Sequence, residues 1–487
     1  MRHPGTGSAE RGPVLFVSLP ESGLLNTMLV LARELASRGV PDLWFATDDH
    51  RRADIEAIDR SNPVRFVPLG EVVSEMSATG YDEETYRKVT QPSRFKSHRA
   101  AIEHTFDPNL QVPKYRALSA AVDRIEPALL VIDVICTYAV DLAITRGIPY
   151  VLSNPFLPSM WLSAHVPFAT SHTPSSFPTP HTGFSQRMSP RQRIENRLFR
   201  WRTLAIFLSP RMSRALRAEG QIRRQLGIDP RARRSMARVN LAELVLCYSL
   251  AELDYPFPLP ANLALTGALT PPLPEAPEDR DDPDGVACWL DSHESVVYIG
   301  LGTLTRLRAD ELAAVVAAAR RLSGRHAVLW KLSAEQQRLL PPRDEWPDTL
   351  RIEDWVPSQL DVLAHSNVVA FVTHAGSNGF HEGIYFGTPL VMRPLWVDCW
   401  DEAVRGEDLG VGVTLDHPHT VDADDLVDKV TRVTSDPAYR RRATELGVAQ
   451  RAAGGRVAAA DRLLALPALT GSVRPETPAT SRPQESR

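Results

Sequence analysis

A short apolar run that stops at a glycine-containing turn constrains this chain more than any other feature. Residues 368–372 read VVAFV, and THAGSNGF follows directly. Five apolar residues are too few for a core helix, so the run predicts a strand that is buried on both faces. Gly376 and Gly379 then mark a turn that leads into a helix. A buried strand followed by a helix is typical of a parallel α/β sheet.

The same turn carries the groups that an anion site needs. Gly376 and Gly379 let the backbone approach a ligand, and the first turn of the helix has free N–H groups. His374 adds a donor, and Glu382, about one turn into the helix, can accept hydrogen bonds from sugar hydroxyls. We therefore expect a site for a diphosphate that carries a sugar. The alternative is an ordinary turn with a capping Asn378 and a core histidine.

Strand-like and helix-like segments alternate along most of the chain in two series. Segments such as 25–37 and 312–322 carry apolar residues at helical spacing between the strand runs. This alternation predicts two doubly wound sheets. The predicted strands are 14–19, 42–49, 64–70, 128–134 and 149–154 in the first series, and 296–302, 326–332, 351–356 and 368–372 in the second.

A composition break separates the two series. Residues 262–285 are rich in proline and acidic residues and have no periodicity, which is typical of an interdomain linker. The first turn, Pro20 to Gly23, lacks the Gly-x-Gly-x-x-Gly of a phosphate loop, so the nucleotide is assigned to the second half. The predicted organisation is a first domain at 13–251, a linker at 252–285, a second domain at 286–466 whose last helix is a candidate to pack back on the first, and disordered tails at 1–12 and 467–487.

The signature H-x-G-x-N-x-x-x-E, followed by G-x-P and P-L-x-x-D, resembles the nucleotide-sugar motif of the UDP-glycosyltransferase superfamily. The likeness is to family 1 and its natural-product and macrolide-type enzymes, and it is dense over residues 355–416. It implies a GT-B fold, in which two Rossmann-like α/β domains face each other across a cleft. The first would bind the acceptor and the second the donor. The matching residues are Trp355, Pro357, His374, Gly376, Asn378, Glu382, Gly387, Pro389, Pro394 and Asp398.

The resemblance also implies roles for single residues. Trp355 would stack on the uracil or thymine, His374 and the turn amides would hold the diphosphate, and Glu382 would bind the ribose. Thr303 matches a turn residue that touches the diphosphate, although a threonine at a strand end is otherwise an ordinary helix cap. The implied donor-binding set is Thr303, Trp355, Gln359, His374, Gly376, Ser377, Asn378, Glu382, Asp398 and Cys399.

Two positions depart from the family pattern. Gln359 is displaced by one residue after Pro357, which weakens the case for its contact with the base. The family's final Asp-Gln pair, which holds the transferred sugar, is Asp398-Cys399 here. Because a thiol is a poorer hydrogen-bond partner than a carboxamide, we expect relaxed or altered sugar choice, such as a deoxysugar on dTDP or an amino sugar in place of UDP-glucose.

The family's catalytic base is missing. Its G-H-x-x-P turn aligns with Gly23 on the glycine and Leu24 on the histidine, and leucine cannot abstract a proton. Asp133 matches the aspartate that orients this histidine, and Glu21 is near Leu24 in sequence. Asp133 is therefore the first candidate for a substitute base and Glu21 the second, although a carboxylate at a strand end is also a common helix cap. Four histidines cannot be ranked as substitute bases, and we expect each of them to be a loop or surface residue: His98, His104, His165 and His172.

Two segments of the first half depart from the alternating pattern. Residues 155–190 are rich in Pro, Ser, Thr, Phe and His, which predicts a long ordered loop, suited to an apolar acceptor. Residues 187–238 are Arg-rich with apolar surface, and a solvated helical hairpin is the favoured interpretation. The alternative is weak contact with an anionic membrane surface. Nucleic acid is disfavoured, since no stacking platform accompanies the charge.

Composition narrows the class further. A net charge of −4 indicates no polyanionic partner, and the absence of a signal segment or a long apolar run predicts a cytoplasmic protein. The four cysteines are widely spaced, so we expect reduced thiols and no structural metal. No cofactor is expected, because the nucleotide sugar is a co-substrate and the resembling enzymes need no metal. The oligomeric state is not indicated.

These observations predict an inverting glycosyltransferase. It would move a sugar from a UDP- or dTDP-sugar to an apolar natural product such as a polyketide, a macrolide or an aromatic aglycone. Leu24 favours the alternative of a catalytically silent auxiliary protein that activates a partner enzyme, while the nearly complete donor motif argues against it. A sugar-nucleotide epimerase on the same architecture is a third reading, and it needs an acid and a base that the sequence does not reveal.

Overall fold

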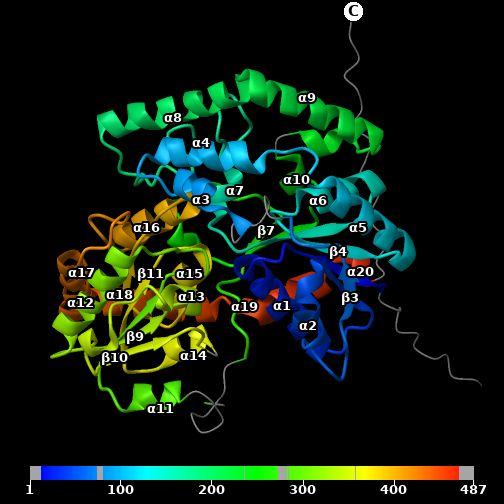
Figure 1. The fold of residues 1–487 in the computed structure, drawn as a ribbon. Helices are drawn as coiled ribbons and strands as arrows, with labels where there is room; N and C mark the ends of the chain where they lie inside the picture. Colours follow the sequence, from blue (N-terminus) through cyan, green and yellow to red (C-terminus); the bar gives the residue numbers. More distant parts are fainter. Residues whose placement is uncertain are drawn as a thin grey trace, which may run out of the picture.

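The computed structural model describes residues 12–73, 80–234, 236–272, 282, 285–356 and 358–470. Two parallel β-sheets lie side by side, each covered by helices on both faces (Figure 1). Each sheet reverses its strand order at the centre, as doubly wound dinucleotide folds do. The predicted GT-B architecture of two Rossmann-like domains is therefore confirmed.

The first sheet has seven strands in the order β3-β2-β1-β4-β5-β6-β7. All neighbouring pairs are parallel, and the central strands are completely buried, as their uninterrupted apolar sequences predict. The strands are β1 Val14–Val17, β2 Leu43–Thr47, β3 Arg65–Pro68, β4 Leu129–Asp133, β5 Tyr150–Asn154, β6 Leu244–Cys247 and β7 Leu263–Leu265.

The second sheet has six strands in the order β10-β9-β8-β11-β12-β13. It repeats the first strand order without the seventh strand. The strands are β8 Val296–Gly300, β9 Ala327–Lys331, β10 Leu350–Glu353, β11 Val368–Thr373, β12 Leu390–Met392 and β13 Gly412–Thr414.

Helices connect the strands and cover both sheets. Those of the first half are α1 Ser22–Ser37, α2 Arg52–Glu56, α3 Glu83–Val89, α4 Arg94–Thr105, α5 Val112–Ile125, α6 Thr137–Arg146, α7 Pro158–Leu162, α8 Pro190–Leu208, α9 Pro210–Gln225 and α10 Ala237–Asn240. Those of the second half are α11 Val286–Asp291, α12 Ala309–Leu322, α13 Ala334–Gln337, α14 Gln359–Ala364, α15 Ser377–Tyr385, α16 Val397–Leu409, α17 Ala423–Ser435, α18 Pro437–Ala452, α19 Gly455–Leu464 and α20 Pro467–Thr470.

The end of the chain returns to the first sheet. Ala459, Ala460 and Leu463 of α19 are completely buried in the core between the first sheet and α1. At the rim of this contact Arg38 pairs with Asp461 at 2.5 Å and Arg456 pairs with Glu34 at 3.0 Å. Figure 1 shows α19 beside α1.

Several segments differ from the sequence expectations. The strand runs of both series are confirmed, but β6, β7, β12 and β13 were not predicted, and β7 lies inside the range 252–285 assigned to the linker. A short helix, α20, occupies the first residues of the expected tail at 467–487. The rest of that tail, residues 1–11 of the other tail, and residues 273–281, 283 and 284 of the linker lie outside the described residues.

The Arg-rich segment forms two helices, but they are not a hairpin. α8 and α9 follow one another end to end across the top of the molecule (Figure 1). A single extended residue, Ser209, joins them, and its side chain caps α9 by accepting from the N–H of Met212. None of the helices in the described ranges has both the length and the apolar composition needed to span a bilayer.

Candidate functional site

The carboxyl ends of the central strands in the two sheets meet at the junction of the two halves. Ligands of doubly wound sheets bind at this edge, where the strand order reverses. Asn378, in the first turn of α15, donates a hydrogen bond at 3.0 Å to the carbonyl of Gly23, in the first turn of α1. The turn after β11 is thus in direct contact with the turn after β1, although the two are far apart in sequence.

His374 lies between two glycines in the turn after β11. A Cβ atom on Gly302 would lie 2.6 Å from the His374 ring, and one on Gly376 would lie 2.3 Å from it, so neither position accepts a larger residue without moving the imidazole. Burial lowers the pKa of His374 to about 4, so the ring is neutral at pH 7. Its Nδ1 is buried and has no hydrogen-bond partner among the described residues. The neutral His374 ring can therefore donate a hydrogen bond to a ligand or accept one from it.

The first turn of α15 adds backbone donors next to His374. Gly376 is the N-cap residue, and α15 begins at Ser377, whose hydroxyl donates to the carboxylate of Glu402 in α16. The Ser377 hydroxyl is used by Glu402 and the Ser377 N–H by Asp398, so the remaining N–H groups of the turn are the main groups left to meet an anion. The predicted phosphate-type turn is present in the expected position relative to a strand and a helix.

Glu382 is held by a short chain of hydrogen bonds. Its carboxylate accepts from Gln359 Nε2 at 2.6 Å, and Gln359 Oε1 accepts from the Tyr298 hydroxyl at 3.1 Å. Burial raises the pKa of Glu382 to about 7, and the Gln359 bond and the charge of Lys331 partly oppose this. Gln359, displaced by one residue from the family position, thus contacts Glu382 directly. Pro357, the residue from which the displacement of Gln359 is counted, lies outside the described residues.

Trp355 marks the far end of this edge. It is 59% exposed, and Lys331 Nζ lies 4.0 Å from the centre of its ring. A cavity of about 170 Å³ opens between Trp355, Thr303 and the end of β9. An exposed aromatic face beside a cavity can stack on a planar ligand group. Lys331 and Tyr298 were missed from the sequence, because their roles depend on neighbouring strands that only the fold brings together.

The first turn of α16 lies beside that of α15. Asp398 accepts hydrogen bonds from the N–H groups of Ser377 and Cys399, and burial raises its pKa to about 7. The Cys399 side chain is 2% exposed, and burial raises its pKa well above the usual value, so it is a neutral thiol with little surface for a ligand. Asp398 is only partly buried and is the better placed of the pair to meet a sugar.

The two candidate carboxylates of the acceptor side, Asp133 and Glu21, lie at the carboxyl ends of strands in the first sheet. Asp133, the last residue of β4, accepts from the N–H of Ile135 at 3.0 Å and from that of Leu19 at 3.4 Å. Burial raises the pKa of Asp133 to about 7, and the nearby charge of Glu21 adds to the shift. Leu24 instead packs against the apolar core of the first half. Asp133 and Glu21, the two candidate bases, are therefore close enough to influence each other, while the place of the family histidine is apolar.

Three histidines gather above this edge without a sequence signal. His98, His165 and His181 come from α4, the loop after α7 and the loop before α8. Burial lowers the pKa of His98 to about 3 and that of His165 to about 4, and that of His181 falls well below its usual value. Asp401 of α16 accepts from the His181 N–H at 2.5 Å, which connects these loops to the second half.

Two facing doubly wound sheets define the class of this molecule as the GT-B fold of glycosyltransferases. Two solved structures share it: the glycotransferase of kitacinnamycin (23% identical, TM-score 0.63) and CalG4, the calicheamicin glycosyltransferase (18% identical, TM-score 0.60). Each comparison covers 93% of this chain and 98% of the other. The chain itself belongs to the UDP-glucoronosyl and UDP-glucosyl transferase family, whose model matches residues 70–451.

Curated relatives match parts of the chain. UDP-glucuronosyltransferase 2A1 of Mus musculus is 27% identical over 321 residues, which are 62% of this chain and 54% of the relative. UDP-glucuronosyltransferase 2B7 of Homo sapiens is 32% identical over 201 residues, or 40% and 34% of the two chains. The 2-hydroxyacylsphingosine 1-beta-galactosyltransferase of Rattus norvegicus is 33% identical over 207 residues, or 42% and 35%. The chain thus matches between about a third and about half of the length of these relatives.

Proposed function

We propose that this protein is an inverting glycosyltransferase that moves a sugar from a UDP- or dTDP-sugar to an apolar hydroxylated natural product. The observation that carries the proposal is the edge of the second sheet. A neutral His374, the remaining N–H groups in the first turn of α15, the carboxylate of Glu382 and the exposed ring of Trp355 follow one another there. Their order matches diphosphate, ribose and base.

The donor is proposed to bind without a metal or another cofactor. The N–H groups at the start of α15 and the His374 ring would stabilise the departing diphosphate in place of Mg²⁺. Glu382, kept in place by Gln359, would accept from the ribose hydroxyls. Asp398 would hold the transferred sugar. Since Cys399 is buried where the family has a glutamine, a deoxysugar or an amino sugar remains our proposal for the transferred group.

Asp133 is the proposed base. A pKa of about 7 suits a group that must accept a proton near neutral pH. The acceptor oxygen would attack the anomeric carbon while the bond from that carbon to the diphosphate oxygen breaks. The acceptor proton would pass to Asp133, or to Glu21 beside it, and the nucleoside diphosphate would leave. A phenol needs less help from such a base than an aliphatic alcohol.

Binding and turnover separate the enzyme from the auxiliary protein. Thermal-shift screening of UDP-, dTDP- and other nucleotide sugars tests donor binding, with His374→Ala as the matched variant. Mass spectrometry of mixtures of the preferred donor with aromatic and macrolide aglycones then tests transfer. Donor binding without any product, in a protein that raises the activity of a second glycosyltransferase, would favour the auxiliary function that Leu24 suggests. A lack of donor binding would contradict both functions.

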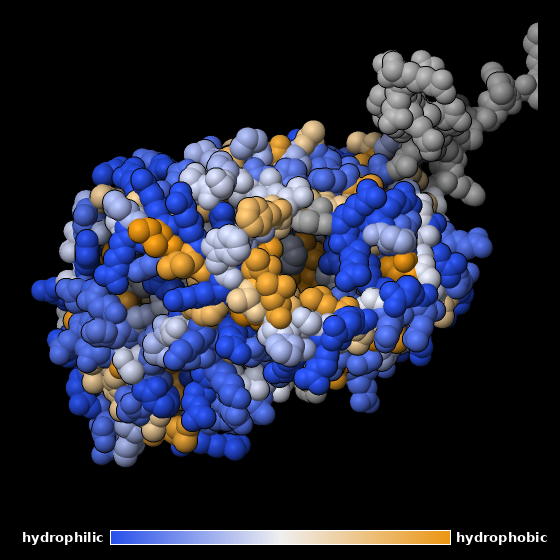
Figure 2. Space-filling model, turned by 90° about the horizontal axis from the view of Figure 1, so that it is seen from above, coloured by the Kyte–Doolittle hydropathy of each residue, from blue (hydrophilic) through white to orange (hydrophobic). Residues whose placement is uncertain are grey.

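A further contact is proposed for the outer face of α8. Ile194, Leu198, Trp201 and Leu208 are exposed along it, and Phe168, which is 91% exposed, packs its ring 5.5 Å from that of Trp201. Figure 2 views the molecule from above and shows apolar side chains among hydrophilic ones on this face. The exposed arginines Arg193, Arg197 and Arg202 flank the apolar side chains.

Such a surface suits weak binding to an anionic bilayer. Sedimentation with phosphatidylserine vesicles, compared with phosphatidylcholine vesicles, tests it. We expect salt-sensitive binding that the triple variant Ile194→Ser, Leu198→Ser, Trp201→Ser loses. If the parent and the triple variant are recovered equally in the vesicle pellet, α8 does not bind the bilayer and is a solvated surface helix.

A further inference from the structure

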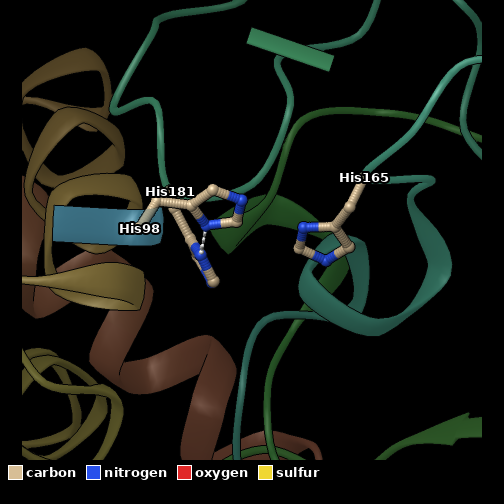
Figure 3. Close-up of side chains that lie close together, drawn as sticks. All are labelled: His98, His165 and His181. Carbon is tan, nitrogen blue, oxygen red and sulfur yellow. Dashed lines mark hydrogen bonds between the residues drawn. The ribbon is translucent and has the colours of Figure 1, made fainter. Parts of the chain in front are cut away.

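The three histidines described above form a compact group of nitrogen donors, which we call the histidine cluster (His98, His165 and His181). One nitrogen from each ring lies within 4.8 Å of the others. His98 and His181 are joined directly, with their Nδ1 atoms 2.9 Å apart, and His165 faces this pair across a gap (Figure 3). The His165 ring is parallel to that of His98, with ring centres 6.1 Å apart.

The hydrogen bonds around His98 determine where its proton lies. The Thr203 hydroxyl donates its only hydrogen to the Phe199 carbonyl at 2.9 Å. It must therefore accept from His98 Nε2, which lies 3.2 Å away. His98 then carries a lone pair on Nδ1, directed at His181. A histidine whose far nitrogen is fixed by a hydrogen bond, with the near nitrogen unprotonated, is the arrangement found at metal-ligating histidines.

The separations are close to those of ligands around one ion. Two nitrogens bound to zinc at about 2.0–2.1 Å lie roughly 2.9–3.4 Å apart for angles between about 90° and 110°. The His98–His181 pair is already at 2.9 Å, with His181 Nδ1 donating to His98 Nδ1, and an ion would replace this hydrogen bond as the His181 proton moves to Nε2. Because the three nitrogens lie within 4.8 Å of one another, His165 needs a shift of at most about 2 Å to join them, by the same bond lengths. His165 and His181 are only partly buried, so solvent can reach the gap.

We propose that the histidine cluster binds one divalent transition-metal ion of the zinc type, with three imidazole ligands and a solvent molecule in the fourth position. Nitrogen donors without a carboxylate disfavour Mg²⁺ and Ca²⁺, which prefer oxygen. Asp401, which contacts the backbone of His181, is already used: its two oxygens accept from the N–H groups of His181 and Gly183. The site lies outside the donor-binding edge and is not part of the proposed transfer chemistry.

A bound ion would order the acceptor side of the molecule. The three ligands come from three separate segments, so one ion would tie α4 to both ends of the loop that runs from α7 to α8. Through Asp401 the same loop is attached to α16, whose first turn carries Asp398. We therefore expect metal to protect residues 163–189 from proteolysis and to raise the melting temperature.

The test uses the untagged full-length protein in a Cys288→Ser background, because Cys288 is an exposed thiol that can bind metal itself. Metal is removed with a chelator, and Zn²⁺ is added back by equilibrium dialysis with elemental analysis. Co²⁺ serves as a visible probe, since its absorption reports coordination by nitrogen. No donor or acceptor is present, so the result does not depend on the proposed glycosyl transfer.

Four proteins give the expected pattern. The parent should bind one Zn²⁺ per chain. His165→Phe keeps an aromatic ring beside His98 and should remove this binding. Thr203→Val retains all three ligands but loses the bond that fixes the His98 tautomer, and should weaken binding by about 10–100-fold. His417→Phe changes an exposed histidine outside the cluster and should bind as the parent does.

Two results would overturn the proposal. One is a parent protein that retains no stoichiometric Zn²⁺ at micromolar free metal. The other is a His165→Phe variant that is folded by circular dichroism and binds Zn²⁺ as tightly as the parent, which would assign the metal to other groups. In either case the three rings are a hydrogen-bonded cluster that supports the loop without an ion.

Discussion

The two halves of the molecule share one strand order, yet they assemble their functional edges in opposite ways. In the second half, nearly all groups of the edge come from one stretch, residues 355–398, together with the turn after β8. In the first half they come from β1, β4, α4 and two distant loops. A local edge leaves a dense signature in the sequence, whereas a dispersed edge leaves almost none. The sequence therefore supports a detailed hypothesis for the donor edge, and none of comparable detail for the acceptor edge.

The largest expected effect concerns the dispersed edge. Asp133→Asn should lower turnover on an aliphatic alcohol acceptor by about 10²–10⁴-fold, because it removes the proposed base. Glu21→Gln should act in the same direction, and neither variant should change donor affinity. Leu24→His should remain active. Steady-state kinetics with calorimetry of donor binding checks this. Full turnover in both carboxylate variants would mean that the proton goes elsewhere, to the loop at 154–190 or to the substrate.

The next effect concerns the local edge. His374→Ala and Glu382→Ala should each weaken donor binding by about 1.5–3 kcal/mol, or roughly 10–150-fold, while the fold survives. Gly376→Ala should do the same indirectly, since its Cβ would displace the His374 ring. Gly23→Ala is the matched control, because a Cβ there meets nothing within 4 Å. Calorimetry with the nucleotide sugar measures all four, and unchanged affinity in the two alanine variants at 374 and 382 would refute the assignment.

The third prediction uses the raised pKa of a buried carboxyl in each half. Asp133 has a pKa of about 7 in the folded protein and an ordinary value near 3.8 when unfolded, so the folded state holds its proton more tightly. The stability that this proton provides is complete below pH 4 and is lost as pH rises through 7. Asp133→Asn has no such loss, so its stability relative to the parent should improve by roughly 1.4 kcal/mol per pH unit between pH 4 and 7.

Urea unfolding at pH 5, 6, 7 and 8 measures this difference. Glu382→Gln provides the same comparison in the second half, since burial also raises the pKa of Glu382 to about 7. Parallel pH profiles for a variant and the parent would show that the carboxyl concerned is not buried in the way the structure describes.

The smallest effect concerns sugar choice. Cys399→Gln should move the ratio of kcat/KM values towards UDP-glucose and away from deoxysugar donors. The shift should be modest, because Cys399 is buried and a larger residue there has to find space, at a cost of about 1–3 kcal/mol in stability. A parent protein that already uses UDP-glucose far better than every deoxysugar donor would contradict the reading of this position.

Local patterns account for the part of the fold that could be predicted. Buried strands such as β11 appear as continuous apolar runs, and the glycine turn after β11 is contiguous with its helix. β7 was missed because it has three residues and lies in proline-rich surroundings. α8 and α9 were expected as a hairpin, since helical periodicity does not show how two helices are joined.

Side-chain partners were the harder part of the site. Nothing near Glu382 in sequence indicates that Gln359 holds it, or that Tyr298 holds Gln359 in turn. The same is true of His98 and His181, which meet only after two loops have folded over α4. Such contacts depend on how helices, strands and loops are positioned against one another, and no local pattern in a single sequence predicts this.

The return of α19 to the first sheet has a consequence for exchanging parts between related enzymes. A hybrid joined within residues 252–285 would combine one parent's α1 with the other parent's α19. Ala459, Ala460 and Leu463 would then meet a foreign surface in a completely buried contact, and the pairs Arg38–Asp461 and Arg456–Glu34 would be broken. A working hybrid therefore needs two junctions, so that the segment after Gly454 comes from the same parent as the first half of the molecule.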